Sequence, residues 1–329
     1  MGTLINIDSN NNRTIVQMGE ATRKAPWIGC GTTGYWTDYR DAMVAGGLDF
    51  YVIGQDAYTN HANMWGTQQP VHVPGIQVNM KAGSDEVMGV VSDNYGIVQN
   101  EDAFSMLEPF TQAGGVIRAA GQTAQGLQFM VMTLEQTNIL GDNYDVDIMA
   151  TNSFNGAFPC AIIMVPTRIV CQNMYRKLLG SSDNVMRFRH GSRVEERMGM
   201  MKHAASNVIA YMDAFKLQLE NAYNYKLGKY DIETLIELLF PYPKPGGKYE
   251  NTSREKVDAL REDFHAKYYL AEDNANFLGT GMGFINAYYD YLSHREPTKN
   301  MQGAWADRRL SGLVSGNDIK PLILRSCVL

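Results

Sequence analysis

The stretch GGVIRAAGQTAQGLQFMVMTLEQ, residues 114–136, decides the fold class that the sequence predicts. It contains two strand-like runs of apolar residues, separated by turn-forming residues between Gly121 and Gly126. Two more strand-like runs follow, NYDVDIMATNSF at 143–154 and FPCAIIMVP at 158–166, preceded by a turn at 141–143. Strands between helices indicate an α+β fold, with an antiparallel or mixed sheet as the core over residues 86–190.

Two helices are predicted to flank these strands. Asn100 is a candidate N-cap for a short amphipathic helix over 100–110, which places Phe104 and Phe110 on one face. After the strands, a second helix is predicted from Pro166 to Leu179 and ends at Gly180.

The segment before the core is predicted to be less regular. Residues 1–30 look like an irregular arm, and a short helix is predicted over 37–46, ended by glycines 46 and 47. Residues 60–84 are rich in Asn, Gln, Pro and Gly and predict a long loop or a pair of irregular strands. Residues 86–100 predict two strands around a turn at 92–94.

The C-terminal half is predicted to be helical. Ser192 and Glu195 form a capping box before a long amphipathic helix, whose seam needs a partner helix in the same chain or in a second subunit. Its apolar positions alternate in steps of four and three: Val194, Met198, Met201, Ala205, Val208, Met212, Phe215 and Leu219. Asp231 is a candidate cap for a helix that ends at Pro241, and further helices are predicted at 252–270 and 280–294.

These elements suggest a division of the chain into five parts. An N-terminal region of arm and loops covers 1–85, the α+β core covers 86–190, and the long helix with its successor covers 191–240. PYPKPGGKYE at 241–250 has the composition of a linker, and 251–329 form a helical C-terminal region.

Composition predicts a soluble globular protein of one large or two ordinary domains. The chain has 329 residues, 45% of them hydrophobic and 19% charged, and a formal net charge of −6. No apolar run approaches the roughly 18 residues of a membrane span, and the N-terminus lacks the pattern of a signal peptide. Four widely spaced cysteines fit a reducing compartment. We therefore expect a cytoplasmic location, in the host cell if a phage encodes the protein, and no membrane partner.

Positive charge is concentrated in one segment of this acidic chain. Residues 168–203 contain eight Lys or Arg and three acids, a net charge of +5, so the remaining residues carry −11. Such asymmetry favours a localised anionic partner. The alternative is that these cations form ion pairs with acids elsewhere in the fold.

Motifs of catalysis and of cofactor binding are absent from the sequence. There is no G-x-S-x-G and no Walker-type phosphate loop, and GTGMGF at 279–284 lacks the preceding strand of a dinucleotide fingerprint. Asp142, Asp145 and Asp147 lack EF-hand spacing, and His61 and His72 have no matching cysteines. We predict no catalytic residues, no metal and no cofactor.

The basic segment contains the residue types that bind single-stranded nucleic acid. Lys and Arg neutralise phosphates, and aromatic side chains cover unstacked bases. YRK at 175–177 and RFRH at 187–190 combine both types. If 185–190 form a strand, Arg187 and Arg189 share one face, and Phe188 with His190 faces the other way.

Several motifs together resemble a known family. They are PWIGCGT (26–32), YGIVQNEDAF (95–104), TNSFNGAF (151–158), PTRIVCQNMYRKLL (166–179), RFRHGSR (187–193) and GTGMGFINAYYDYLSHR (279–295). This set is similar to the phage/plasmid-like proteins, a domain-of-unknown-function family numbered nine-three-two. The resemblance implies a gene of phages, prophages or plasmids without an established activity.

The chain departs from the family pattern at two places. Where the family usually has a His-Asp pair followed by Gly-Ser, this chain has Phe154, Asn155, Gly156 and Ala157, and Ile28 occupies a position at which histidine is common. If either histidine were a family catalyst, this member would be inactive. The order of helix, strands, helix and basic segment is also similar to single-strand annealing proteins of the RecT, Red-beta and Erf type, which need neither ATP nor metal.

We therefore predict an oligomeric protein, as a ring or filament, that binds single-stranded DNA and anneals it without ATP during phage recombination. The predicted DNA-binding residues are Arg168, Gln172, Asn173, Tyr175, Arg176, Lys177, Arg187, Arg189, His190, Arg193, Arg197 and Lys202. Two alternatives remain open: an interaction protein that binds a host or defence factor, and a divalent-metal nuclease that uses Asp145 and Asp147.

Overall fold

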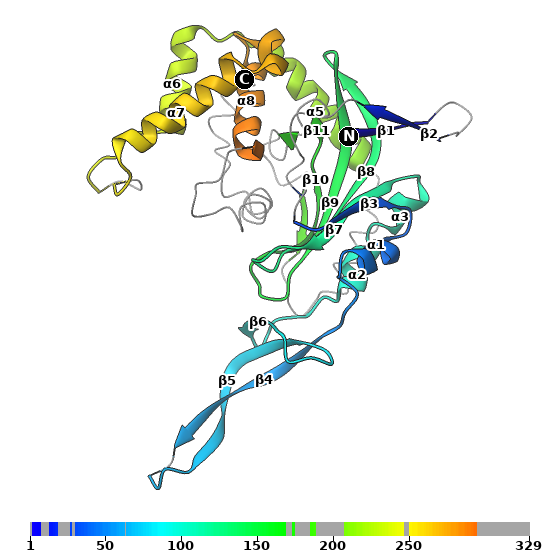
Figure 1. Ribbon diagram of the computed structural model, residues 1–329, viewed down its shortest axis with the longest axis vertical. Coiled ribbons are helices and arrows are strands. Elements are labelled where there is room, and N and C mark those ends of the chain that lie inside the picture. The colour runs from blue at the N-terminus through cyan, green and yellow to red at the C-terminus, as the bar shows by residue number, and fades with distance from the viewer. Residues whose placement is uncertain are drawn as a thin grey trace.

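A computed structural model shows an α+β protein with a central sheet, a helical region and a projecting β-sheet arm (Figure 1). It describes residues 2–7, 13–18, 27, 30–62, 64–168, 173–174, 185–188, 207–246 and 250–294. Within these ranges, no helix is long and apolar enough to cross a membrane.

The central sheet is antiparallel and is built on four strands that follow one another in the chain. They are β7 (Val116–Gln122), β8 (Gln128–Ile139), β9 (Asp142–Asn152) and β10 (Cys160–Met164). β3 (Thr32–Trp36) pairs with β7, and β9 pairs with both β8 and β10. The α+β fold with an antiparallel core is therefore confirmed, since apolar residues recur along these strands as the sequence predicted.

Apolar clusters cover both faces of this sheet. Alternate residues of β9 divide between them: Val146 and Ile148 belong to the larger cluster, which also contains the helices, and Met149 belongs to the smaller one. Because both faces are buried, β9 is almost continuously inaccessible to solvent.

The chain after Pro166 differs from the prediction. At four positions of the helix predicted over 166–179 the structure has strands instead: Thr167–Arg168 form β11 and Asn173–Met174 form β12, while 169–172 and 175–179 lie outside the described residues. Thr167 and Arg168 pair with Asp145 and Tyr144 of β9, so tertiary pairing overrides the local preference for helix. β13 (Val185–Phe188) pairs with β10, which confirms the strand predicted at its first four positions.

Short helices pack at one end of the sheet. They are α1 (Tyr39–Ala45), α2 (Asn100–Ser105) and α3 (Glu108–Gln112). α1 ends at Gly46, as predicted. Asn100 lies inside α2 and its buried side chain donates to the Leu48 carbonyl, so its predicted role as an N-cap is wrong. The Asn100 amide bonds to the carbonyl of Leu48, a residue distant in sequence, because the segment around Leu48 lies against the start of α2.

A long three-stranded sheet projects from this end of the molecule (Figure 1). We call it the arm: β4 (Val52–Ala62), β5 (Gln68–Lys81) and β6 (Val87–Ser92), all antiparallel. The sequence had predicted a loop or irregular strands at 60–84. It had also predicted a second strand after the turn at 92–94, which is wrong because 95–99 form no strand.

The N-terminal region contains a second hairpin. β1 (Gly2–Ile7) and β2 (Arg13–Met18) pair along their whole length, so the prediction of an irregular arm over 1–30 is wrong for these residues.

The helical region consists of α5 (Asn207–Asn224), α6 (Lys229–Leu239), α7 (Arg254–Tyr269), the 3₁₀ helix η3 (Glu272–Phe277) and α8 (Gly281–His294). Phe215 and Leu219 of the predicted seam are buried in the chain's own core. The seam residues up to Ala205, and the capping box before them, lie outside the described residues. Asp231 sits three residues inside α6, where its carboxylate accepts from the N-cap Gly228 N–H at 2.8 Å.

Candidate functional site

Arg168 was predicted to bind phosphate, and the structure contradicts this. Its side chain is only 1% exposed. Its guanidinium lies 2.6 Å from Asp142 Oδ2 and 3.0 Å from Asp273 Oδ2, and it also donates to the Asp273 carbonyl at 2.7 Å. Burial raises the pKa of Asp142, and the neighbouring guanidinium opposes that rise. Arg168 therefore ties β11 to β9 and η3, because a buried cation needs partners of this kind.

The described parts of the remaining basic segment lie at the margin of the sheet. Asn173 is in β12, the last strand of the main order, and Arg187 is in β13, which pairs with β10 alone among the described strands. The other predicted DNA-binding residues lie outside the described ranges: Gln172, Tyr175, Arg176, Lys177, Arg189, His190, Arg193, Arg197 and Lys202. The structure thus brings Arg187 and Asn173 to one side of β9 through separate strands.

Asp145 and Asp147, the residues of the nuclease alternative, belong to a buried polar cluster in the sheet. Arg118 donates to Asp145 Oδ2 at 2.7 Å, and Gln136 donates to Asp145 Oδ1 at 2.8 Å. The Thr133 hydroxyl donates to Asp147 Oδ1 at 2.6 Å. A guanidinium therefore already pairs with Asp145, and no group of three metal-ligating side chains occurs among the described residues.

Asp147 is the most strongly perturbed carboxyl of this cluster. Complete burial and the adjacent Asp145 charge raise its pKa to about 7, while Arg118 and hydrogen bonds from Thr133 and Thr167 oppose the shift. Such a carboxyl changes its charge near neutral pH while buried away from solvent. Its ionisation therefore affects the free energy of unfolding, and the buried group is poorly placed to act on a substrate.

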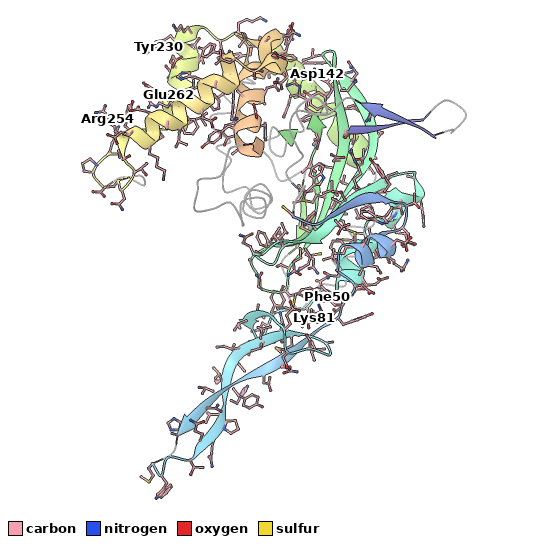
Figure 2. The ribbon with its side chains drawn as sticks, viewed as in Figure 1. Phe50, Lys81, Asp142, Tyr230, Arg254 and Glu262 are labelled. Atoms are coloured by element: carbon pink, nitrogen blue, oxygen red, sulfur yellow. The ribbon has the colours of Figure 1, made fainter. Side chains whose placement is uncertain are left out.

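The root of the arm is held by a set of buried contacts with the loop 153–158 (Figure 2). Asn79 of β5 is fully buried and donates to the Phe154 carbonyl at 2.6 Å. The Phe154 ring lies 5.9 Å from the Phe50 ring, and Lys81 Nζ lies 4.8 Å from the centre of the Phe50 ring, where both residues lie together at the root (Figure 2). Gly89 approaches Asn155 so closely that a Cβ there would overlap its backbone. These contacts fix the base of the arm to the core.

A second set of amides joins the same root to the central sheet. Asn152 at the end of β9 donates to the Val98 carbonyl at 2.9 Å and to Asn100 Oδ1 at 3.0 Å. Gln99 exchanges two hydrogen bonds with the backbone of Val52, the first residue of β4. These hydrogen bonds pair most of the buried polar groups at the root, whereas Asn152 Oδ1 has no partner among the described residues.

Beyond its root, the arm exposes large apolar side chains. Tyr58 is 62% exposed, and Met64 and Trp65 at the tip are 84% and 81% exposed. The arm also exposes several aliphatic residues of β4, β5 and β6: Ile53, Val71, Val87 and Val90. Exposed apolar surface of this extent is typical of an interaction site.

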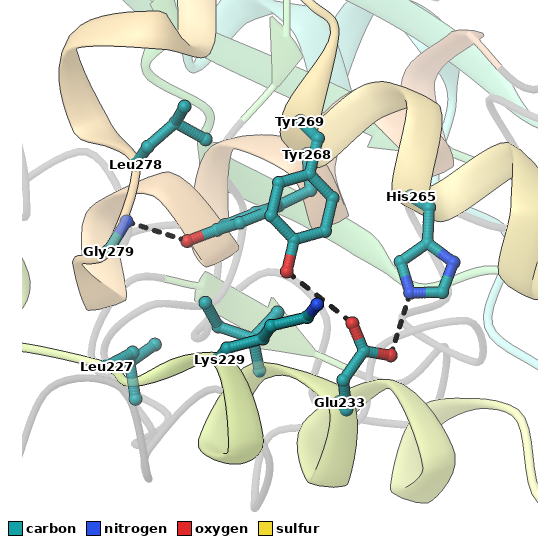
Figure 3. A pocket seen from close by; sticks show the side chains of 9 residues that line it. Leu227, Lys229, Glu233, His265, Tyr268, Tyr269, Leu278 and Gly279 are labelled. Carbon is teal, nitrogen blue, oxygen red and sulfur yellow. Dashed lines mark hydrogen bonds and ion pairs between the residues drawn. The ribbon is translucent and has the colours of Figure 1, made fainter.

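A pocket of about 600 Å³ lies between α6, the end of α7 and the turn before α8 (Figure 3). Its lining is mainly apolar, with Leu227, Leu278 and Tyr268 among its members. His265 Nε2 lies 2.9 Å from Glu233 Oε2, and the Tyr269 hydroxyl donates to Glu233 Oε1 at 3.5 Å. Burial and the Glu233 charge raise the pKa of Tyr269. This set could hold a small apolar group beside a carboxylate, and it contains no activated nucleophile.

A family model described as Domain of unknown function (DUF932) matches residues 87–313. The chain belongs to this family. This match confirms the resemblance seen in the motifs. The comparisons with curated proteins and with solved structures found no match.

The DUF932 match begins at Val87, the first residue of β6, so β4 and β5 of the arm precede it. The motif TNSFNGAF is the loop that holds the arm. Phe154 and Asn155 of this motif serve here in packing and backbone hydrogen bonding.

The glycine-rich stretch GTGMGF at 279–284 allows close helix packing. The Gly279 N–H donates to the Tyr268 hydroxyl at 2.9 Å, and the Gly281 N–H donates to the Tyr225 carbonyl at 2.8 Å. A Cβ at Gly283 would overlap the Phe277 carbonyl. The glycines thus let α8 approach η3 and the end of α5, and they do not form a phosphate loop.

The sequence left residues 60–84 open between a loop and a pair of irregular strands, of which the structure has the strands, and it did not indicate Arg118 or the Glu233–His265 pair. The alternation of apolar residues in β5 is interrupted by Pro70 and Pro74, which favoured a loop. Glu233 and His265 are 32 residues apart and belong to no motif. Residues 51–59 contain Tyr, Val, Ile and Thr, and residues 71–78 contain several Val and an Ile; these residue types favour strands and were the indication of the arm in the sequence.

Proposed function

We propose that this DUF932 protein binds single-stranded DNA through the segment after Arg168 and promotes annealing without ATP. The observation that carries the proposal is the charge of residues 169–203, which contain seven Lys or Arg and three acids in a chain of net charge −6. The position of β12 and β13 at the margin of the described sheet supports it, since such a segment is not enclosed on both sides by other strands.

The proposed mechanism is electrostatic. Phosphates bind along the cations Arg176, Lys177, Arg187, Arg189, Arg193, Arg197 and Lys202, and the bases stay unpaired and available. Tyr175 offers a ring for stacking, and Gln172, Asn173 and His190 offer hydrogen bonds to the backbone. Arg168 is removed from this set and anchors the start of the segment to the core.

Analogy with the RecT, Red-beta and Erf annealing proteins gives weaker support. The order of short helices followed by antiparallel strands remains similar, but strands β11 and β12 replace the expected second helix at their positions. Similar order alone does not establish function. By the same analogy we propose assembly as a ring or filament, and action in the cytoplasm, that of the host cell if the gene belongs to a phage.

Fluorescence anisotropy with labelled single- and double-stranded oligonucleotides tests the proposal. We expect tighter binding to the single strand, and a steep loss of affinity between about 50 and 200 mM salt. When Arg187 and Arg189 are replaced with alanine, the slope of log affinity against log salt concentration should become less steep by about 1–2. Annealing of complementary strands should proceed without ATP and in the presence of chelator.

Lys216→Ala is the matched control, because Lys216 is an exposed cation on α5 outside the basic segment. It should leave both affinity and salt dependence unchanged. Absence of single-strand binding at low salt would refute the proposal. DNA cleavage that is lost in chelator and in Asp145→Ala would instead favour the nuclease alternative.

A further inference from the structure

The arm has one face that is turned away from the core and is mainly apolar. Side chains alternate along a strand, and the strand registers show which ones share this face. We call it the outer face. Its members are Ile53, Gln55, Ala57, Thr59, His61, Gln69, Val71, Val73, Ile76, Val78, Met80, Val87, Val90 and Ser92.

The opposite face makes the contacts with the core. Asn79 donates to the Phe154 carbonyl from that side, and Gly89 lies against Asn155 there. Tyr58 and His72 also lie on it, with their ring centroids 5.6 Å apart. The described core thus covers only the base of the inner face and does not reach the outer face.

The outer face is exposed where it is most apolar. Val90 is 62% exposed, Val87 is 55% exposed, and Ile53 and Val71 are 46% and 45% exposed. A three-stranded sheet needs its apolar face covered to gain stability from it. None of these residues is Asp, Glu, Lys or Arg, and His61 near the tip is the one ionisable residue among them, so little charge favours contact of this surface with water.

We propose that the outer face packs against the outer face of a second copy of the chain, around a two-fold axis. A two-fold contact places the same patch on both partners, and like charges would then oppose each other. The outer face meets this condition because none of its residues is Asp, Glu, Lys or Arg. Two sheets packed face to face about 10 Å apart would bury the valines and Ile53 of both arms.

The size of the face suits a dimer of moderate affinity. A strand of 11 residues such as β4 spans roughly 36 Å, and two to three strands are about 10–14 Å wide. The flat area is therefore about 400–500 Å² per copy, and the two copies together approach the ~1,000 Å² at which specific interfaces begin. We expect a dissociation constant on the order of micromolar.

The position of the arm allows this contact. It projects beyond the rest of the described molecule, so two arms can overlap while their cores remain apart (Figure 1). The contacts of Asn79 and Phe154 at its root hold the outer face in a fixed direction. The contact is closed at two copies, so a ring or filament would require a further interface.

The test is sedimentation velocity of the full chain over a concentration series, without DNA. The wild-type chain should pass from monomer to dimer as its concentration rises through about 1–100 µM. Val90→Asp places a charge on the outer face and should weaken association at least tenfold, because that charge would be buried without a partner. Tyr58→Asp is the matched control: its side chain is also 62% exposed but lies on the inner face, so the dimer should persist.

Val90→Thr provides a second variant that keeps the branched shape favoured in strands, and it should weaken association several-fold. A wild-type chain that stays monomeric to the highest concentration would overturn the inference. Equal effects of the two aspartates, whether both abolish the dimer or both leave it intact, would do so too. The result is independent of the DNA proposal, since anisotropy reports single-strand binding by the Val90→Asp monomer.

Discussion

The central sheet and the arm are both antiparallel sheets of long strands, yet apolar side chains are buried in the first and largely exposed in the second. In the central sheet, Val131 and Ile148 are fully buried between elements of the same chain. In the arm, Val87 and Val90 are more than half exposed. The same residue type thus stabilises one sheet by burial within the chain and, in the other, forms a surface available to a partner.

The polar groups of the two regions differ in the same way. The central sheet contains buried ion pairs such as Arg118–Asp145 and Arg168–Asp142, whereas the arm has buried polar contacts only at its root among the described residues. The arm is therefore held in position by its contacts with the core at the root. The described core makes its buried ion pairs without any residue of the outer face.

Arg168→Ala should produce the largest loss of stability. It leaves Asp142 and Asp273 without their shared cation, and breaking a buried pair costs about 4 kcal/mol. Urea denaturation should show this loss, and Lys216→Ala, at an exposed position on α5, should show none. An unchanged denaturation midpoint for Arg168→Ala would mean that the ion pairs do not stabilise the core.

Phe154→Ala should separate the arm from the core. The ring is 1% exposed and contacts Phe50, so its removal should cost about 3 kcal/mol through a cavity at the root. Hydrogen exchange should become faster in β4–β6 than in β8 and β9. Equal acceleration in both sheets would show that arm and core unfold as one unit.

Asp147→Asn should change how stability depends on pH. The pKa of Asp147 is raised to about 7 in the folded chain, above its unfolded value, so the folded state holds a proton that the unfolded state loses. Its contribution is therefore present at low pH and declines as pH rises toward 7.

The difference in unfolding free energy between wild type and Asp147→Asn should shift by about 2 kcal/mol between pH 5 and pH 7, to the disadvantage of the wild type at pH 7. Urea denaturation at the two pH values measures it. Asp213→Asn, at an exposed carboxylate on α5, is the control. A parallel pH dependence in wild type and Asp147→Asn would contradict the raised pKa.

The smallest effect is expected for a matched pair of valines, one in each sheet. Val131→Ala in β8 should cost about 2 kcal/mol, since its side chain is fully buried. Val90→Ala in β6 should cost less than about 0.5 kcal/mol at concentrations too low for association. Similar losses at the two positions would mean that the isolated arm already buries its outer face.

Much of the fold could be predicted from local patterns. The strands at 116–122, 128–139, 142–152 and 160–164, and the helices α1, α7 and α8, follow from apolar periodicity, turn residues and caps. The helix expected after Pro166 failed because backbone pairing of Thr167 with β9 outweighs propensity. The arm stayed open between a loop and irregular strands because Pro70 and Pro74 interrupt the pattern of β5, although a proline is tolerated in an edge or bulged strand.

The candidate site shows the same limits. Charge counting located the basic segment, but it could not tell that Arg168 is held by Asp142, 26 residues earlier, and by Asp273, 105 residues later. It also could not tell that Arg118 lies beside Asp145. Ion-pair partners at such separations are set by how strands and helices pack, and no local pattern encodes them.

The sequence by itself determined the fold class, the family motifs and the uneven distribution of charge, because each depends on residue type and short spacing. Only the tertiary structure decided which arginine is buried, which loop supports the arm and which face of the arm is left uncovered. Those outcomes depend on distant strands and side chains meeting, and the free energy of such meetings belongs to the folded chain as a whole.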